Sequence, residues 1–342
     1  MKSLFIVLVL ITLLIYVIKS KQSLVKLNSL NTETVYPLRG ICAFFIVLHH
    51  LVCNTILGNY SLLHPIWYWG APIVGVFFFL SGYGLTKSLE CKVDYLKNFF
   101  RKRFLKILLP FLLVILVDES CFIATGQFTF TDFFHKVLTG NPSPNTWFVV
   151  ALCLYYILFY LSARVTKSNL RKLCLLMWLA SMLFMVFVVF KKSNPTWYRT
   201  VFCLPIGITF AIYEQRIVNR IKNTNDGIRR LFIALFIGMV IFVVLFSIFG
   251  DSGKVANPIK FIANHLFPVI VIFLMLFVKI PSNALLEFFS HYSYEIYLIH
   301  GILIYFLPPY CGDSPLLLTI LVYSITCIVA VGVNKASAML HR

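Results

Sequence analysis

Long apolar runs separated by short polar loops constrain this chain more than any other feature. Of its 342 residues, 60% are hydrophobic and 12% are charged, whereas a soluble domain is about half apolar and about a quarter charged. Most runs approach the roughly 20 residues that an α-helix needs to cross the hydrocarbon of a bilayer. The sequence therefore predicts an all-α fold, a polytopic transmembrane helix bundle in a lipid bilayer. The eleven predicted spans are residues 3–18, 38–57, 70–86, 104–124, 146–163, 173–190, 200–213, 231–249, 261–279, 288–307 and 315–333.

The first run differs from the ten that follow it. Residues 3–18 are short for a full span, and Lys19 and Lys21 follow directly, without the clear cleavage site of a secretory signal. We interpret residues 1–20 as an uncleaved extra N-terminal helix and residues 36–333 as a ten-helix membrane domain. No segment is polar enough to form a separate soluble domain.

The lysines and arginines are distributed unevenly between alternate loops. When these loops are assigned to the two sides of the membrane, one side has 23 of the 30 basic residues and the other has 7. The side richer in lysine and arginine is normally cytoplasmic. The sequence therefore predicts a multi-pass protein of the cell membrane with cytoplasmic basic loops. Arg39 then lies at the cytoplasmic boundary.

Net charge and cysteine spacing argue against two classes of ligand. The net charge is +18, but the basic residues are spread over short loops rather than gathered in one patch, so we expect no nucleic-acid partner. The nine cysteines contain no CxxC pair and no metal-ligand spacing. We interpret them as small packing residues and predict no metal site.

The stretch PLRGICAFFIVLHHLV, residues 37–52, places ionisable side chains in an apolar helix. Arg39 and His50 are eleven positions apart, so they share one helical face about 16 Å apart along the axis, whereas His49 points about 100° away from His50. Ionisable groups inside a bilayer are costly and often functional. His50 is then a candidate general base or acyl-accepting nucleophile. The alternative is a membrane anchor at Arg39 and a hydrogen-bonded packing histidine at position 50.

A basic cluster lies where a predicted cytoplasmic loop enters a helix, in FFRKRFLKILLP. It consists of Arg101, Lys102, Arg103 and Lys106. One interpretation is ordinary anchoring at the cytoplasmic face. The other is a clamp for the phosphates of a nucleotide-like ligand, since arginine and lysine bind phosphate well.

Small residues interrupt the apolar stretch GVFFFLSGYG, residues 75–84. Gly75, Ser81, Gly82 and Gly84 permit close approach of another backbone. Tight packing between helices is the favoured interpretation. Close approach of a ligand, with Ser81 in contact with it, is the alternative.

Ionisable residues also occur in SHYSYEIYLIHG, residues 290–301. His291 and Glu295 are four positions apart and can pair on one face of a helix, whereas His300 lies roughly 140° from Glu295. A glutamate inside a membrane needs a partner. Polar contacts between helices and a role at a site are both compatible with this stretch.

Two other features are explained by the membrane boundary. Asp118 and Glu119 lie near the predicted outer end of a span, where they need no functional explanation. Trp147 lies at a predicted interface, where membrane proteins place an aromatic belt.

Taken together, these stretches resemble the acyltransferase 3 family of membrane O-acyltransferases. The Arg39–His50 spacing matches the family signature of arginine, ten residues and histidine, and FFFLSGYGL matches its phenylalanine-rich run ending in Ser-Gly. The third family pattern is Arg-Arg-x-x-Arg followed by proline. Here Lys102, Arg103 and Lys106 precede Pro110, so two arginines are replaced by lysines. The segments TWFVVALCLYY, LPIGITFAIYE and SYEIYLIH are also similar to the family.

The resemblance implies a bacterial inner-membrane enzyme that moves an acyl group, most often acetyl, from cytoplasmic acyl-CoA to a hydroxyl of a cell-surface saccharide or lipid-linked precursor. Acetyl-CoA would be a co-substrate. His50 and Arg39 would be catalytic, and the basic cluster would bind the CoA phosphates. The further candidates for substrate contact are Ser81, Trp147, Glu295 and His300. The alternative function is a transporter or flippase of a lipid-linked saccharide, in which the buried arginine, histidine and glutamate form a proton relay.

Overall fold

The computed structural model describes residues 30–126, 146–224, 253–277 and 280–340, with a few further residues at 129, 131–132, 227, 230–231, 233–238 and 240–241. The regular structure in these ranges is helical throughout, and they contain no β-strand. The predicted all-α class is therefore confirmed. The predicted extra helix at 3–18 lies outside the described residues, and the predicted span 231–249 is described only in part.

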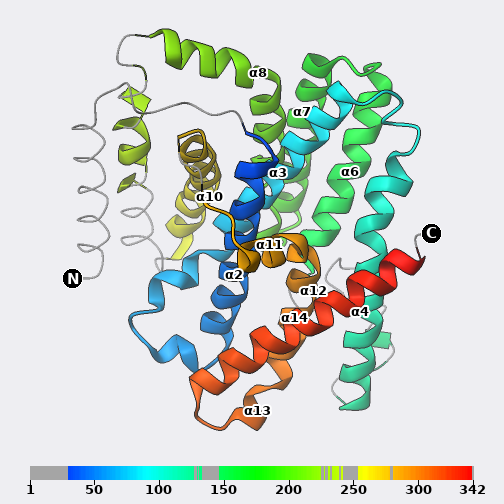
Figure 1. The fold of residues 1–342 in the computed structure, drawn as a ribbon, viewed down its shortest axis with the longest axis vertical. Helices are drawn as coiled ribbons and strands as arrows, with labels where there is room; N and C mark the ends of the chain where they lie inside the picture. The colour runs from blue at the N-terminus through cyan, green and yellow to red at the C-terminus, as the bar shows by residue number, and fades with distance from the viewer. Residues whose placement is uncertain are drawn as a thin grey trace. The chain divides into compact units, whose positions relative to one another are not determined.

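The main α-helices follow the predicted apolar runs (Figure 1). Among the described residues, seven helices are long and apolar enough to cross a membrane, so the chain is a multi-pass membrane protein. The α-helices are α2 (Thr32–Asn54), α3 (Gly70–Cys91), α4 (Leu105–Ala124), α6 (Trp147–Val165), α7 (Leu170–Phe190), α8 (Cys203–Asn223), α10 (Gly253–Met275), α11 (Ala284–His291), α12 (Ser293–Phe306), α13 (Pro308–Cys311) and α14 (Pro315–Leu340).

Short helical turns complete the chain. They are η2 (Ile56–Asn59), η3 (His64–Tyr68) and η5 (Pro195–Trp197), which are 3₁₀ turns, and η4 (Phe100–Phe104), which is a turn of π-helix. The π-helical turn leads directly into α4. Single π-helical turns are rare and frequently lie at functional sites.

The predicted span 288–307 is wrong in one respect, because two helices replace it. The helix α11 ends at His291 and α12 begins at Ser293. Tyr292 separates them and has φ −97° and ψ 15°, which lies in the sparsely populated bridge region between the helical and extended conformations. A break within an apolar run leaves no trace in the hydropathy pattern, so the sequence alone did not reveal it.

The described residues fall into two compact units that alternate along the chain. The first unit lies within Met1–Pro37, Ala71–Glu90 and Leu170–Ser282. The second unit lies within Leu38–Gly70, Cys91–Asn169 and Asn283–Arg342. His50 and the basic cluster both belong to the second unit.

Close contact between backbones holds α3 against α8 in the first unit. A Cβ atom on Gly82 would overlap the carbonyl oxygen of Leu204, and one on Gly207 would overlap the carbonyl oxygen of Phe79. Glycines at such crossings permit van der Waals packing that a larger residue prevents. The favoured interpretation of the small residues in α3, tight helix packing, is confirmed at Gly82.

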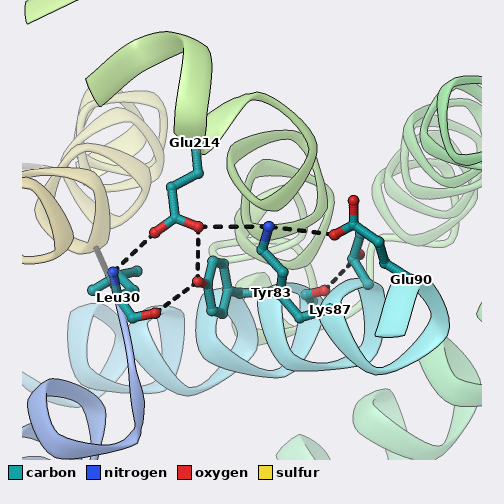
Figure 2. A network of polar contacts seen from close by, with 7 residues as sticks. Leu30, Tyr83, Lys87, Glu90 and Glu214 are labelled. Carbon is teal, nitrogen blue, oxygen red and sulfur yellow. Dashed lines mark hydrogen bonds and ion pairs between the residues drawn. The ribbon is translucent and has the colours of Figure 1, made fainter. Parts of the chain in front are cut away.

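A buried carboxylate in the first unit fixes the backbone of Leu30, two residues before the start of α2 (Figure 2). Glu214 of α8 is buried, and its Oε1 accepts a hydrogen bond of 2.9 Å from the backbone N–H of Leu30. The hydroxyl of Tyr83 lies 2.9 Å from both Glu214 Oε2 and the carbonyl oxygen of Leu30, so it can donate its proton to either. Lys87 Nζ lies 3.6 Å from Glu214 Oε2 and 3.4 Å from Glu90. The ion pair with Lys87 compensates the buried negative charge.

In the second unit, α12 packs against α4 and α14. The hydroxyl of Tyr294 donates a hydrogen bond of 2.7 Å to the carbonyl oxygen of Ile107, in the first turn of α4. Near the other end of both helices, the ring of Phe122 lies 5.2 Å from Tyr305 and 5.1 Å from Phe306. These contacts run along the length of α12 and hold it parallel to α4.

Candidate functional site

The helix α2 contains Arg39, His49 and His50, as the sequence predicts. It is continuous from Thr32 to Asn54, so the eleven-residue spacing places Arg39 and His50 on one face. The middle of the helix is apolar and packed, with Ile46 and Val47 buried. This packing fixes the rotation of α2 and therefore the direction of its polar face.

His300 of α12 lies beside His50, and the sequence alone did not bring these two residues together. The ring centroids of His50 and His300 are 5.0 Å apart, and the two ring planes are tilted by 37°. His300 is fully buried. The ring of Tyr297, one turn earlier on α12, lies 5.6 Å from the His300 ring. Two imidazoles from helices far apart in the sequence therefore form a pair inside the second unit.

The hydrogen bond of His300 to its own helix determines which ring nitrogen bears the proton. His300 Nδ1 lies 3.0 Å from the carbonyl oxygen of Ile296. A carbonyl oxygen only accepts, so Nδ1 must be the donor, and neutral histidine then has a lone pair on Nε2. This Nε2 is buried and has no hydrogen-bond partner among the described residues. His300 thus presents a base that is still available.

His49 has a structural role on the other side of His50. Its Nδ1 donates a hydrogen bond of 2.8 Å to the carbonyl oxygen of Ile66. A Cβ atom on Gly70 would overlap the His49 ring, so Gly70 leaves the space that this ring occupies. The rings of His49 and His50 are 4.7 Å apart. His49 therefore fixes the loop after α2 and forms one wall beside His50.

His50 itself makes no side-chain hydrogen bond to the residues that the structure describes. Its neighbours on two sides are imidazoles rather than acidic groups. A histidine with this environment can accept a proton from a hydroxyl group. The sequence-based role of His50 as a general base is compatible with this geometry and stays a prediction.

Arg39 connects α2 to the start of α12. Its Nη2 donates a hydrogen bond of 2.9 Å to the hydroxyl oxygen of Ser293, which is buried. One residue further along α2, a Cβ atom on Gly40 would overlap the carbonyl oxygen of Leu286 in α11. The backbone of α11 therefore lies directly on α2. Ser293 was missed by the sequence interpretation, because a serine next to a tyrosine gives no signal of an arginine partner.

Glu295 has a different partner from the predicted one. It is buried, and its Oε1 accepts a hydrogen bond of 2.7 Å from Asn334 Nδ2 of α14. The predicted pairing with His291 assumed one continuous helix, but His291 ends α11 and Glu295 lies in α12. The contact with Asn334 joins α12 to α14, so Glu295 is a residue that holds helices together.

The basic cluster lies on and just after the π-helical turn η4. Arg101, Lys102 and Lys106 are exposed, and Arg103 is half-buried with its guanidinium 5.9 Å from the ring of Tyr95. The preceding residue, Phe99, is fully buried among aromatic rings and anchors the turn. Its partners are Tyr95, Phe100, Tyr156, Phe159 and Tyr160. Three positive charges thus project outward from a rigid aromatic base.

Ser81 and Trp147 are placed in different units. Ser81 is half-buried on α3 in the first unit. Trp147 begins α6 in the second unit, and its ring lies 6.5 Å from Phe148. The Phe148 ring lies 5.1 Å from Tyr297, which contacts His300. Trp147 is therefore connected to the histidine pair through two intervening rings.

Asp118 and Glu119, which the sequence places near the outer end of a span, are buried in the structure. Both lie on α4 in the second unit, with 2% and 4% of their surfaces exposed. The helix α4 ends at Ala124, as the sequence predicts, and the expectation that a boundary position accounts for these two residues stays a prediction. Within the described residues, no three histidine, cysteine, aspartate or glutamate side chains are arranged to hold a metal ion.

The fold and this geometry define a class, a multi-pass α-helical membrane protein with a buried histidine pair and an exposed basic turn in one unit. A sequence model of an acyltransferase domain matches residues 38–335. The chain therefore belongs to the acyltransferase 3 family. The match covers α2 to α14, and so it includes His50, His300 and the basic cluster. Neither the search of curated proteins nor that of solved structures found a match.

Proposed function

We propose that this protein is an integral-membrane O-acetyltransferase. It moves an acetyl group from cytoplasmic acetyl-CoA to a hydroxyl of a cell-surface saccharide or of a lipid-linked saccharide precursor, in a bacterial cell membrane. The observation that carries the proposal is the environment of His50. This imidazole lies in a candidate membrane span, beside His300, in a chain of the acyltransferase 3 family.

The chemistry assigned to His50 is general-base catalysis. Its neutral imidazole takes the proton of the acceptor hydroxyl while the hydroxyl oxygen attacks the acyl carbon of the thioester. The carbon–sulfur bond then breaks, and the CoA sulfur receives the proton. Assistance of this kind typically contributes about 10²–10⁴-fold to the rate. A transient acetyl group on His50 is the other route by which the same residue would act.

The basic cluster is assigned to the phosphates of CoA. Arg101, Lys102 and Lys106 are exposed, and lysine binds phosphate as a compact charge on a flexible stem. The excess of lysine and arginine on this side of the membrane favours a cytoplasmic location, where acyl-CoA is present. Arg39 is half-buried near the same predicted boundary and is assigned to the thioester end of the donor.

The test compares membrane vesicles that contain the parent protein, His50→Ala or His64→Ala. The vesicles receive acetyl-CoA labelled in the acetyl group, and free CoA thiol and labelled saccharide are measured. His64 is an exposed histidine that bonds the carbonyl oxygen of Gly58 and stacks on Trp67, so it is a matched control.

The proposal predicts thiol release and a labelled saccharide with the parent and with His64→Ala, and a loss of both by at least about 100-fold with His50→Ala. Full activity of His50→Ala at a normal membrane level would contradict the catalytic assignment. Movement of saccharide across the vesicle membrane without consumption of the thioester would instead favour a transporter.

A further inference from the structure

We propose that His300 is a positioning residue that shares the proton taken up by His50, so that the two imidazoles act as one base. This inference rests on the proposed acetyl transfer and gives His300 a role other than the substrate contact that the resemblance implies. It makes the catalytic group a pair from two helices, α2 and α12, instead of one histidine.

The separation of the two rings fits a hydrogen bond between their nitrogens. A ring nitrogen lies about 1.1 Å from the centroid and an N–H···N bond spans about 2.9 Å, so two imidazoles joined nitrogen to nitrogen have centroids about 5 Å apart. The observed distance between the His50 and His300 centroids is 5.0 Å. In the structure no hydrogen bond joins the two rings, so the His50 ring must turn to bring a nitrogen onto His300 Nε2.

The neutral His300 ring can accept this hydrogen bond, because its proton is on Nδ1 and its lone pair is on Nε2. The Nδ1–H of His300 donates a hydrogen bond to the carbonyl oxygen of Ile296, which leaves the Nε2 lone pair buried and without a partner among the described residues. An unsatisfied buried polar atom is costly and calls for an explanation in a native structure. A hydrogen bond from a protonated His50 would satisfy this nitrogen during the reaction.

Burial explains why such sharing would matter. When His50 takes the proton of the acceptor hydroxyl, it becomes a cation in surroundings of low polarity, where an isolated charge is disfavoured. No carboxylate contacts the His50 ring in the described part of the chain. The Nε2 lone pair of His300 would stabilise the imidazolium through a charge-assisted hydrogen bond. The shared proton then passes to the departing CoA sulfur, so no net proton is gained or lost.

His49 is not an equivalent partner for His50. Its Nδ1 also donates to a carbonyl oxygen, that of Ile66, but its Nε2 lies 3.8 Å from the thiol sulfur of Cys53. Its ring also fills the space beside Gly70, where a Cβ atom would overlap Nε2. His300 therefore remains the neighbour with an unused acceptor.

The experiment uses the full chain in vesicles and compares His300→Leu with His300→Gln. Leucine removes the acceptor and keeps an apolar side chain, whereas the glutamine carbonyl oxygen can accept a hydrogen bond near the position of Nε2. Each variant is also made in the His50→Ala background. The readouts are kcat and KM for acetyl-CoA, measured by thiol release, together with the amount of protein in the membrane.

The control is His265→Gln in the first unit. His265 is a half-buried histidine whose two nitrogens are both occupied, since Nδ1 donates to the carbonyl oxygen of Phe261 and Nε2 accepts from the N–H of Phe202. Its replacement is expected to reduce the amount or stability of the protein without a specific loss of kcat.

The proposal predicts that His300→Leu lowers kcat about 10–100-fold with little change in KM, as expected for loss of a hydrogen bond to a charged group. His300→Gln should recover a large part of kcat. In the His50→Ala background, neither variant should have a further effect, because His300 acts through His50.

Two results would overturn the proposal. One is an unchanged kcat in His300→Leu at a normal membrane level. The other is a loss of kcat that is equally large whether His50 is present or replaced, which would show that His300 has a purely structural role. If His300→Leu does not accumulate, His300→Phe takes its place, because phenylalanine also lacks a hydrogen-bond acceptor, and the same fall in kcat with His50 present is then required. Absence of thiol release by the parent would instead contradict the proposed function itself.

Discussion

Arg39 Nη2 lies 2.9 Å from Ser293 Oγ, so the arginine of α2 is held by the first residue of α12. The contact depends on the break at Tyr292, because Ser293 begins a new helix there. The guanidinium is therefore positioned by a helix that also contains His300. This connection between α2 and α12 leads to the first prediction.

Replacement of Ser293 by alanine should impair catalysis more than it impairs folding. The change removes an acceptor from a charged donor, and such hydrogen bonds are worth about 1.5–3 kcal/mol. We expect kcat to fall on the order of tenfold, with a smaller loss than in Arg39→Ala. Thiol release from acetyl-CoA measures the effect. Ser120→Ala on α4 is the control, since this exposed hydroxyl bonds only the carbonyl oxygen of Leu116 in its own helix. An equal loss in both variants would contradict the prediction.

Replacement of Gly40 by alanine should destabilise the second unit. The new methyl group would overlap the carbonyl oxygen of Leu286, which belongs to backbone and has little room to move. Overpacking of this kind costs about 1–3 kcal/mol. Thermal unfolding in detergent should therefore begin at a lower temperature.

The matched control for that glycine is Gly332→Ala. No atom lies within 4 Å of a Cβ atom placed on Gly332 of α14. Alanine is a better helix former than glycine by about 1 kcal/mol, so this variant should be as stable as the parent or more so. A lower unfolding temperature in Gly332→Ala than in Gly40→Ala would show that the close approach of α2 and α11 does not determine how a glycine-to-alanine change affects stability.

The Glu214 network should depend on hydrogen bonds more than on charge. In Glu214→Gln the side-chain oxygen can still accept from Leu30 N–H, and the amide can donate to the hydroxyl oxygen of Tyr83. In Glu214→Ala the buried groups lose their partner, which costs about 1–3 kcal/mol. We therefore expect a clear loss of thermal stability in the alanine variant and a small one in the glutamine variant.

Hydrogen exchange provides a local measurement of the same network. The amide of Leu30 should exchange faster in Glu214→Ala than in the parent, because its acceptor is gone. Lys97→Ala removes an exposed ion pair with Asp94, whose two side chains are 73% and 57% exposed, and such pairs contribute about 0–1 kcal/mol. If Lys97→Ala destabilises as much as Glu214→Ala, burial is not what makes the network important.

Neutralisation of the basic turn should weaken binding of acetyl-CoA. In the double variant Lys102→Gln and Lys106→Gln, we expect KM for acetyl-CoA to rise several-fold with kcat nearly unchanged, because phosphate contacts are equal in the ground and transition states. The effect should shrink at high salt, which screens exposed charges. The control replaces Lys191 and Lys192, an exposed pair after α7. A fall in kcat without a change in KM would refute the assignment to phosphate.

The sequence was sufficient for the class of fold and for the candidate catalytic helix. Apolar runs of about 20 residues and a helical repeat of about 3.6 residues are local properties, so they give the spans and the common face of Arg39 and His50. The same local properties wrongly predicted one continuous span across Tyr292, because the hydropathy of an apolar run does not reveal where one helix ends and the next begins.

The composition and periodicity of this chain by themselves determined a membrane-spanning helical protein with an arginine and a histidine in line on one helix. Only the tertiary structure decided that His50 has His300 as its neighbour, that Ser293 holds Arg39 and that Asn334 pairs with Glu295. The physical reason is that partners separated by 39 to 254 positions are selected by the packing of helices against one another. A side chain's helical face follows from its own segment, whereas the group opposite that face depends on the fold of the whole unit.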